Sequence, residues 1–289
     1  MTLPLDRLVF SPEAAVIGRT IMDFSALDQA IMMSQAEDAA ATDGTPLNKL
    51  SARVMNDGGN LDDLAEYGGR QCYRSWSKGR DPEQYVANII EQGHGSIFEH
   101  AVMNFQITGV SRSLTHELIR HRAGNAFSQE SQRYVDAKDM RFVVPALLAH
   151  HLKETTDMSE AALETDAALT MFREKCAADI ASYVEHQALY KRIAGEYPGL
   201  VSAKKRANEA AREVLPNAAE TRLLFTANLR SFRHIASSRG AEFADLQIRR
   251  LACLMLDVAR EHSPIFFAAV KRDIGTDGMA IITAENGKV

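Results

Sequence analysis

The sequence has few cysteines, one tryptophan and no long apolar run. Its three cysteines, Cys72, Cys176 and Cys253, are odd in number and far apart, so free thiols are expected rather than a disulfide framework. The absence of a CxxC pair argues against a cysteine-rich zinc site. No apolar stretch approaches the roughly 20 residues of a membrane helix, and the first residues do not have the pattern of a secretory signal. These absences predict a cytoplasmic protein with no membrane partner.

A basic excess is also missing. Lysine and arginine number 33 against 38 acidic residues, and the formal net charge is −5. Proteins that coat nucleic acid usually carry a basic excess or stripe, so no nucleic-acid partner is expected. Any bound phosphate must be held by local arginines, which favours a small anionic ligand. The length of 289 residues allows one large domain or two small ones.

Apolar periodicity and helix caps predict the elements of the first half. Residues 14–22 can form an opening strand, and residues 101–108 alternate apolar and polar side chains like a half-buried strand that Gly109 ends. The pair Asp81-Pro82 places an N-cap before a proline at the first helical position, so a helix begins there and Gly93 ends it.

The second half is mainly helical. A long helix is expected over residues 163–196 and another over residues 202–214. Strands mixed irregularly with helices, without a βαβ rhythm, predict the α+β class. The other expected elements are a short helix from Ser111 or Ser113 to about His121, a loop at Gly124-Asn125, strands over residues 141–145 and 221–227, and helices over residues 231–238 and 243–260.

The stretch THELIRHR, residues 115–122, contains part of the zinc motif HExxH. That motif needs two histidines four residues apart on one helix face. His116 and His121 are five apart, or about 140° around a helix, so no metal site is expected. Glu117, Arg120 and His121 share a helix face by their spacing, and such a set usually forms a solvated, salt-bridged surface.

Two neighbouring segments carry groups that bind anions. Arg120-His121-Arg122 places two guanidinium groups at a helix end, where they suit bidentate capture of phosphate. SQESQRY, residues 128–134, adds hydroxyl, amide and guanidinium groups that can satisfy a phosphate and the edge of a base. A solvated polar loop has a similar composition, so both interpretations stay open at this point.

Three further polar segments are each ambiguous alone. GHGSIFEH, residues 93–100, gathers histidine, serine and glutamate at a helix–strand junction, where ligand sites often lie and capped turns are common. Arg212 and the segment NLRSFRHIASSR, residues 228–239, add basic groups that in isolation most often form a solvated face.

Taken together, these segments resemble the flavin-dependent thymidylate synthase family. RHR, a short spacer and S-Q-x-S-x-R-Y form its signature, and RQCYRSW, GHGSIFEH, THELIRHR, EVLPNAAETR, NLRSFRHIASSR and ADLQIRRLA follow in the family's order over residues 61–267. The resemblance implies a central, mostly antiparallel sheet flanked by long helices. It also implies an N-terminal strand and peripheral extension over residues 1–60, a catalytic domain over 61–272 and a C-terminal tail over 273–289.

The resemblance further implies a reaction. The family converts dUMP into dTMP with methylenetetrahydrofolate as carbon donor, FAD as hydride carrier and NADPH as reductant, and it uses no cysteine nucleophile. The cofactor supplies the redox chemistry, while the protein positions it and tunes the local charge. The family is a homotetramer whose sites are shared between subunits, so dUMP, folate, NADPH and further copies of the chain are the implied partners.

The resemblance assigns roles to individual residues. Arg239 should be catalytic, because it polarises the uracil ring and favours the form deprotonated at N3. His94 and Tyr134 should stack with folate or nicotinamide against the flavin, and Ser131 is assigned to binding because no adjacent base is evident. The implied dUMP-binding residues are Glu117, Leu118, Ile119, Arg120, Gln129, Glu130, Ser131, Gln132, Arg133, Arg212 and Arg239. The implied FAD-binding residues are Ser96, Glu99, Arg120, His121, Arg122, Gln129, Asn228, Leu229, Arg230 and His234.

The sequence departs from the family pattern in three places. Eight residues, 123–130, separate RHR from Ser131 where the family has seven, so a bulge is expected within residues 123–127. Phe243 stands where members often have a flavin-contacting histidine, and its apolar ring cannot donate a hydrogen bond. Residues 23–60 form a stretch longer than the family core needs.

Two other functions compete with this interpretation. The main alternative is a non-catalytic nucleotide- or RNA-binding module that uses the Arg120–Arg133 cluster, although the interleaved aromatics of a binding stripe are missing. A metal-dependent nucleotide hydrolase would use four histidines, and the failed HExxH spacing counts against it. Those histidines are His94, His100, His116 and His121.

Overall fold

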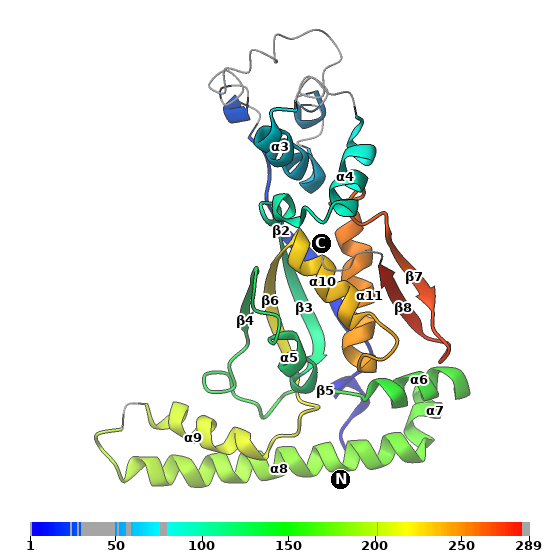
Figure 1. Cartoon of the computed structure of the whole chain (residues 1–289). Helices are drawn as coiled ribbons and strands as arrows, with labels where there is room; N and C mark the ends of the chain where they lie inside the picture. Colours follow the sequence, from blue (N-terminus) through cyan, green and yellow to red (C-terminus); the bar gives the residue numbers. More distant parts are fainter. Residues whose placement is uncertain are drawn as a thin grey trace. The chain divides into compact units, whose positions relative to one another are not determined.

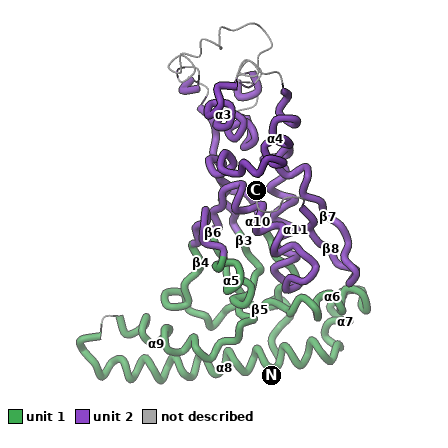
Figure 2. The backbone as a smooth tube through the Cα atoms, viewed as in Figure 1, with its two compact units in different colours: residues 1–13, 107–120, 128–223 green, residues 14–106, 121–127, 224–289 purple. Residues whose placement is uncertain are grey.

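The computed structural model describes residues 2–23, 25–27, 29, 50, 52–55, 59–75, 80–200 and 202–284. The chain divides into two compact units, each built from several stretches of sequence (Figure 2). Unit 1 comprises residues 1–13, 107–120 and 128–223, and unit 2 comprises residues 14–106, 121–127 and 224–289.

The largest sheet has four strands in the order β2-β3-β6-β4 (Figure 1). β2 and β3 run antiparallel. The Thr20 N–H donates to the Val102 carbonyl over 3.0 Å, and a Cβ on Gly18 would meet the Asn104 side chain, so residue numbers rise along one strand as they fall along the other. The expected α+β class with an antiparallel sheet is confirmed. The strand bounds are β2 (Glu13–Arg19), β3 (Val102–Ser111), β6 (Glu220–Asn228) and β4 (Asn125–Gln129).

β3 follows its alternating sequence. Met103, Phe105 and Ile107 are fully buried, while the residues between them are half-buried. This confirms the expected strand, but the expected end at Gly109 is wrong, because β3 continues to Ser111. Gly109 has a φ of +67°, and a Cβ there would lie 2.6 Å from the carbonyl oxygen of Ser11, so glycine bends the strand without ending it.

In unit 2, α4 (Pro82–Glu91) begins as its sequence predicts. The Asp81 side chain accepts a hydrogen bond from the Gln84 N–H over 2.9 Å, and Gly93 follows the helix with a φ of +72°. The 3-10 helix η3 (Gly95–Glu99) comes next. α4 buries the expected apolar face, made of Tyr85, Val86, Ile89 and Ile90.

Three further helices of unit 2 are α3 (Leu61–Tyr73), α10 (Leu229–Arg239) and α11 (Leu246–Arg260), capped by Asn60, Asn228 and Asp245. Aromatic rings pack in the core of this unit. The Phe232 ring lies 5.1 Å from that of Phe105 and 5.6 Å from that of Phe267. An antiparallel hairpin, β7 (Val270–Ile274) and β8 (Ala280–Ala284), lies where only a tail was expected. The expected division at residues 60 and 272 stays a prediction.

In unit 1, α5 (Arg112–Leu118) follows β3 directly. The Ser111 side chain caps it, as expected. The helix was expected to reach His121 but ends at Leu118, so the expected helix face shared by Glu117, Arg120 and His121 is wrong. Only the first of the three residues lies in the helix.

The rest of unit 1 is built on long helices. α8 (Ala167–Gly195) packs along α9 (Ala203–Ala211), and Asp166 caps α8, so the single helix expected over residues 163–196 is interrupted there. Leu8, Phe142, Leu152, Leu169 and Cys176 lie in its core. The remaining elements are η1 (Leu5–Arg7), β1 (Leu8–Val9), which pairs in parallel with β5 (Phe142–Val143), α6 (Ala146–Thr155), α7 (Glu160–Thr165) and η4 (Arg212–Val214).

The extension before α3 falls largely outside the described residues. Among those that are described, Leu27, Leu50 and Val54 form a small apolar cluster against Tyr67. Arg53 binds two carboxylates of α3. None of the described helices combines the length and the apolar character needed to cross a membrane.

Candidate functional site

The RHR motif leads into a tight turn in unit 2. The Asn125 N–H donates to the Arg122 carbonyl over 3.4 Å, and Gly124 has a φ of +73°. A Cβ on Gly124 would lie 2.4 Å from Nδ2 of Asn228, so the Asn228 side chain occupies the space that a larger residue would need. Asn125 Nδ2 donates to Ser231 Oγ over 2.7 Å, and that hydroxyl donates to the Ala123 carbonyl. The turn is therefore fixed to the start of α10.

The extra residue of this segment does not produce the expected bulge. The Asn228 N–H donates to the Gly124 carbonyl over 3.1 Å, and the Glu130 N–H donates to the Arg222 carbonyl over 2.9 Å. Six residues separate the two positions on each strand (130 − 124 and 228 − 222), so the register of β4 against β6 is constant. The expected bulge in residues 123–127 is wrong, because most of the expected loop pairs as strand β4.

A pocket of about 260 Å³ lies at the N-terminus of α10 in unit 2. Arg230 Nη1 bonds Glu99 Oε1 there over 2.6 Å, and the Asn228 side chain accepts from the Ser231 N–H over 2.8 Å. A helix N-terminus beside a guanidinium favours an anionic group. The lining residues are Glu99, Ala123, Gly124, Asn228, Arg230, Ser231 and His234.

Four of the expected FAD-binding residues, Glu99, Asn228, Arg230 and His234, therefore line one pocket. The others of unit 2 lie differently. Ser96 and Arg122 are exposed outside this lining, and Leu229 is fully buried.

His121 and Arg239 meet in unit 2. Arg239 Nε lies 2.9 Å from His121 Nε2, and the ring of His234 stands nearly edge-on to that of His121 with centroids 5.7 Å apart. Burial lowers the pKa of His121 to about 4, and the charge of Arg239 and the nearby His234 act in the same direction. The imidazole is therefore neutral at physiological pH and accepts the arginine's hydrogen bond.

The two residues expected to stack on a ring ligand each have a neighbour. His94 lies at the rim of a pocket of about 350 Å³ in unit 2 and stacks on Tyr73, with centroids 6.3 Å apart. Tyr134, in unit 1, is exposed and has Lys205 Nζ 4.5 Å from its ring centroid. Their roles toward folate or nicotinamide stay predictions.

Arg112 is a candidate residue that the sequence analysis missed. It opens α5 in unit 1, and its Nη1 is buried without a hydrogen-bond partner among the described residues. Burial lowers its pKa, Arg212 lowers it further, and Glu130 opposes both. A cation at a helix N-terminus beside a second cation is unfavourable unless an anion lies there. A basic residue directly after a serine cap was the available sequence signal.

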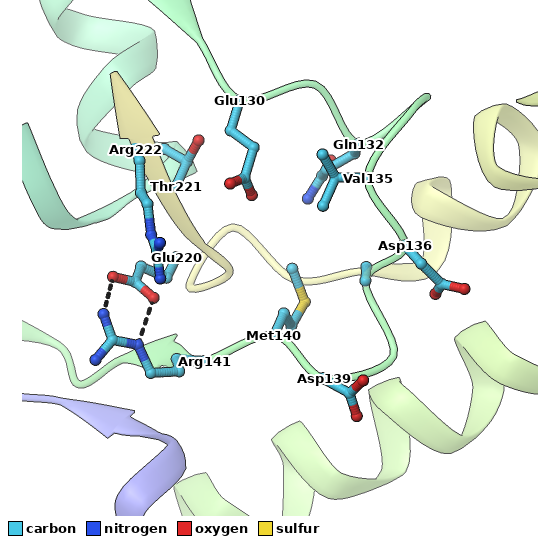
Figure 3. A pocket seen from close by; sticks show the side chains of 11 residues that line it. Glu130, Gln132, Val135, Asp136, Asp139, Met140, Arg141, Glu220, Thr221 and Arg222 are labelled. Carbon is cyan, nitrogen blue, oxygen red and sulfur yellow. Dashed lines mark hydrogen bonds and ion pairs between the residues drawn. The ribbon is translucent and has the colours of Figure 1, made fainter. Parts of the chain in front are cut away.

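The loop after β4 uses its side chains in two ways. In unit 1, Gln129 donates to Thr221 Oγ1 over 3.1 Å, and Arg133 Nε pairs with Glu209 over 3.1 Å. Glu130 and Gln132 instead line a second pocket, of about 320 Å³ (Figure 3). The expected dUMP-binding residues of this loop therefore do not all line one pocket.

The second pocket has both acidic and basic walls. Figure 3 shows Glu130 and Gln132 on one side of it and the ion pair of Arg141 with Glu220 on another. Arg141 Nε donates to Glu220 Oε2 over 2.7 Å, while Gln132 Nε2 is buried without a partner among the described residues. The ion pair of Arg141 with Glu220 is already satisfied, so Gln132 is the group in this pocket that most needs a ligand.

The remaining expected dUMP-binding residues of unit 1 lie on and after α5. Glu117 is half-buried, Leu118 is fully buried, and Ile119 and Arg120 are exposed. Ser131 is half-buried in the loop after β4, where its Oγ accepts from the Arg133 N–H over 3.4 Å.

Comparison with known proteins shows the family of this chain. The sequence model of the family described as "Thymidylate synthase complementing protein" matches residues 53–265. The chain is 41% identical over 226 residues to the flavin-dependent thymidylate synthase of Mycobacterium tuberculosis (strain ATCC 25618 / H37Rv), which covers 76% of this chain and 84% of that protein. The chain belongs to the flavin-dependent thymidylate synthase family.

Other relatives in this family show the same range of similarity. The flavin-dependent thymidylate synthase of Mycobacterium avium (strain 104) is 40% identical over 226 residues, covering 76% of this chain and 84% of that protein. That of Mycobacteroides abscessus is 41% identical over 209 residues, covering 71% of this chain and 77% of that protein. The family-model match over residues 53–265 includes the RHR motif, the loop after β4 and all of α10.

Two observations concern Phe243 and the alternative of a metal-dependent hydrolase. Phe243, where family members often have a histidine, is 88% exposed, so its ring has little contact with the described protein. Within the described ranges, no three histidine, cysteine, aspartate or glutamate side chains gather as a metal site. The hydrolase alternative therefore gains no support from this part of the chain.

Proposed function

We propose that this protein is a flavin-dependent thymidylate synthase, which methylates dUMP to dTMP with methylenetetrahydrofolate as carbon donor, FAD as hydride carrier and NADPH as reductant. Family membership supports the reaction class. The nucleotide assignment rests on the half-buried Arg112. Its Nη1 has no partner among the described residues, and burial and the positive charge of Arg212 both lower its pKa. A dianionic phosphate offsets such a pair of cations.

The dUMP site proposed here uses the loop after β4 and the arginines of unit 1. Arg112 and Arg212 bind the phosphate, and Ser131 donates its hydroxyl to the nucleotide without attacking it. Arg133 shares its charge with Glu209, so it contributes to phosphate binding less than Arg112 does. Glu117, Leu118, Ile119, Arg120, Gln129, Glu130 and Gln132 complete the proposed contacts.

The FAD site proposed here uses the pocket at the N-terminus of α10. When bound, FAD supplies the hydride transfer that these side chains cannot perform. The residues fit an anionic group of the cofactor, because the N-terminus of α10 and Arg230 line one pocket. Gly124 also lines this pocket and has no side chain to fill it. Ser96, Glu99, Arg120, His121, Arg122, Gln129, Asn228, Leu229 and His234 complete this set.

Arg239 is the proposed catalytic residue. A guanidinium beside the uracil ring stabilises negative charge that develops when N3 loses its proton. The neutral His121 accepts the Nε–H bond of Arg239 without adding a charge of its own. His94 and Tyr134 are proposed to stack with the folate or nicotinamide ring.

The reaction proposed here needs no cysteine nucleophile. Burial raises the pKa of Cys176 to about 12, and burial also raises the pKa of Cys253. Both thiols therefore stay protonated at neutral pH and are poor nucleophiles. Cys72 is exposed on α3.

The assembly proposed here is a homotetramer in the cytoplasm with sites shared between subunits. Met171, Leu189 and Ile193 are exposed apolar side chains that share one face of α8 by their spacing. Burial of this face against another copy supports assembly.

The direct test is the absorbance spectrum of the purified protein. The proposal predicts a flavin band that bleaches when NADPH is added without oxygen, and dTMP formation when dUMP and methylenetetrahydrofolate follow. A colourless protein that binds no added FAD contradicts the proposal. If such a protein instead bound single-stranded RNA, the non-catalytic binding module would replace it.

A further inference from the structure

The hydrogen bond between Arg239 and His121 fixes a protonation state. Arg239 Nε donates to His121 Nε2 over 2.9 Å, and both residues belong to unit 2. A guanidinium has only donors, so Nε2 must offer a lone pair and the ring proton must sit on Nδ1. The bond therefore requires one neutral tautomer of His121 and is lost when the imidazole is protonated.

The surroundings of the ring favour that same state. Burial is the main cause that lowers the pKa of His121, and two groups on α10 add to it, the guanidinium of Arg239 and the ring of His234. The imidazole therefore keeps its acceptor over the whole range in which an ordinary histidine begins to titrate. It does not add a positive charge beside Arg239.

The backbone of His121 and the residue Arg239 are both connected to α10. Asn125 Nδ2 donates to the His121 carbonyl over 3.0 Å and to Ser231 Oγ over 2.7 Å, so the backbone of His121 is tied to the first turn of α10. Arg239 is the last residue of that helix. Since α10 is a regular helix of 11 residues, the His121 ring has a defined position relative to Arg239.

We propose that His121 is a positioning residue for Arg239: its neutral imidazole accepts the Nε–H bond and so sets the plane of the guanidinium. The Nε–H bond and the two terminal amino groups lie in one plane, so an anchor at Nε decides where the amino groups point. This inference rests on the proposed role of Arg239 at the uracil ring. Electrostatic stabilisation depends on preorganised donors, so a loosened guanidinium should slow turnover more than it weakens nucleotide binding.

The first test reads the tautomer and needs no activity. The full-length protein, labelled with ¹⁵N-histidine, is examined by long-range ¹H–¹⁵N NMR from about pH 8 to about pH 5.5, a range that brackets ordinary histidine titration. The His121 signals are identified by their loss in His121→Gln. We expect the neutral form protonated on Nδ1, with no titration in this range. An imidazolium at neutral pH, or the form protonated on Nε2, overturns the proposal.

The second test separates acceptor chemistry from packing. His121→Leu removes the acceptor, whereas His121→Gln keeps an amide oxygen that can receive the Nε–H bond. We expect His121→Leu to lower kcat about 10- to 100-fold with a change in KM for dUMP below about threefold, and His121→Gln to recover most of kcat. Flavin absorbance is recorded for each variant to confirm cofactor loading. Equal losses in both variants overturn the proposal.

A double-mutant cycle completes the test. Arg239→Lys removes the planar Nε–H, so adding His121→Leu to it should cause little further loss if His121 acts through Arg239. Additive losses contradict that route. The matched control is His100→Leu, an exposed histidine of unit 2 outside both proposed ligand sets. If the parent protein forms no dTMP, the proposed function fails, while the tautomer measurement still decides the positioning role.

Discussion

Arginines on α3 and α5 differ in what surrounds them, although both are shielded from solvent. Arg70 on α3 is 1% exposed; its Nε bonds Glu66 over 2.7 Å, and its terminal nitrogens bond the carbonyls of Ser75 and Arg80. Arg112 on α5 has a buried Nη1 without a described partner, and Arg212 adds a second positive charge. A fully paired buried arginine holds the fold, whereas an unpaired one indicates that a ligand brings the missing charge.

The same contrast extends to other arginines of the chain. Arg173, 3% exposed in unit 1, bonds both oxygens of Glu164, and Arg249, 1% exposed in unit 2, pairs with Asp277. The Nε of Arg239 instead bonds the neutral ring of His121. Arg70, Arg173 and Arg249 therefore each have a carboxylate partner, whereas Arg112 Nη1 is buried without a partner among the described residues.

The largest effect is expected from Arg239→Ala. The guanidinium is the proposed stabilising group at the uracil ring, so its removal should lower dTMP formation about 10²- to 10³-fold, the usual scale for losing a preorganised stabilising donor. Flavin absorbance should remain, because the pocket at the start of α10 is untouched. Turnover is measured by dTMP production under saturating substrates. Activity near that of the parent protein would refute the assigned role.

A fully paired arginine should instead matter to the fold. Among the described residues, Arg70→Leu leaves the carboxylate of Glu66, itself 2% exposed, with its bond to Arg53 alone, so we expect the free energy of unfolding to fall by about 3 kcal/mol. Urea denaturation measures it. Arg206→Met removes a surface ion pair with Glu209 and is the control, with an expected loss below about 0.5 kcal/mol. Similar losses in both variants would remove the basis of the comparison.

Ser131→Ala tests a neutral member of the nucleotide loop. If the hydroxyl binds the nucleotide and does not attack it, one hydrogen bond to a charged or polar group is lost and turnover should fall about tenfold. Steady-state kinetics and dUMP affinity are measured together. Complete loss of turnover with unchanged dUMP affinity would argue that Ser131 is a nucleophile.

The smallest effect concerns pH. Above about pH 6.5 His121 is neutral in both states, but as pH falls toward about 4 the unfolded chain takes up a proton that the folded protein refuses. The free energy of unfolding should therefore fall over this window, by about 1 kcal/mol for a half-exposed ring. Parallel urea titrations of the parent and His121→Gln check it. The slope should be shallower in the variant, and equal slopes would contradict the depressed pKa.

Local signals in the sequence predicted much of the fold. The Asp81-Pro82 pair specified the start of α4, and the alternation of Met103, Phe105 and Ile107 specified β3, because capping and periodicity act within a few residues. β4 was missed, since its exposure alternates without buried apolar residues and its strand geometry comes from pairing with β6. The β7–β8 hairpin was missed as well, because the resemblance to the family implied only a tail over residues 273–289.

The candidate site was less predictable than the fold. The family signature identified the loop after β4 and α10, but Arg112 was missed because its state depends on Arg212, which is distant in sequence. The link between His121 and Arg239 likewise arises only from tertiary structure. The expected bulge failed because strand register, set by a partner strand, decides where an extra residue is accommodated.

The most direct test of this account compares dUMP with deoxyuridine, which lacks the phosphate. Calorimetry on the flavin-loaded protein should show a strong preference of the parent for dUMP, and Arg112→Met should reduce that preference about 10- to 100-fold, the value of a hydrogen bond to a charged group. Its free energy of unfolding should change little, because the buried Nη1 has no hydrogen bond to a described residue to lose. An unchanged preference for dUMP in Arg112→Met would contradict the central claim that unpaired arginines mark the ligand site.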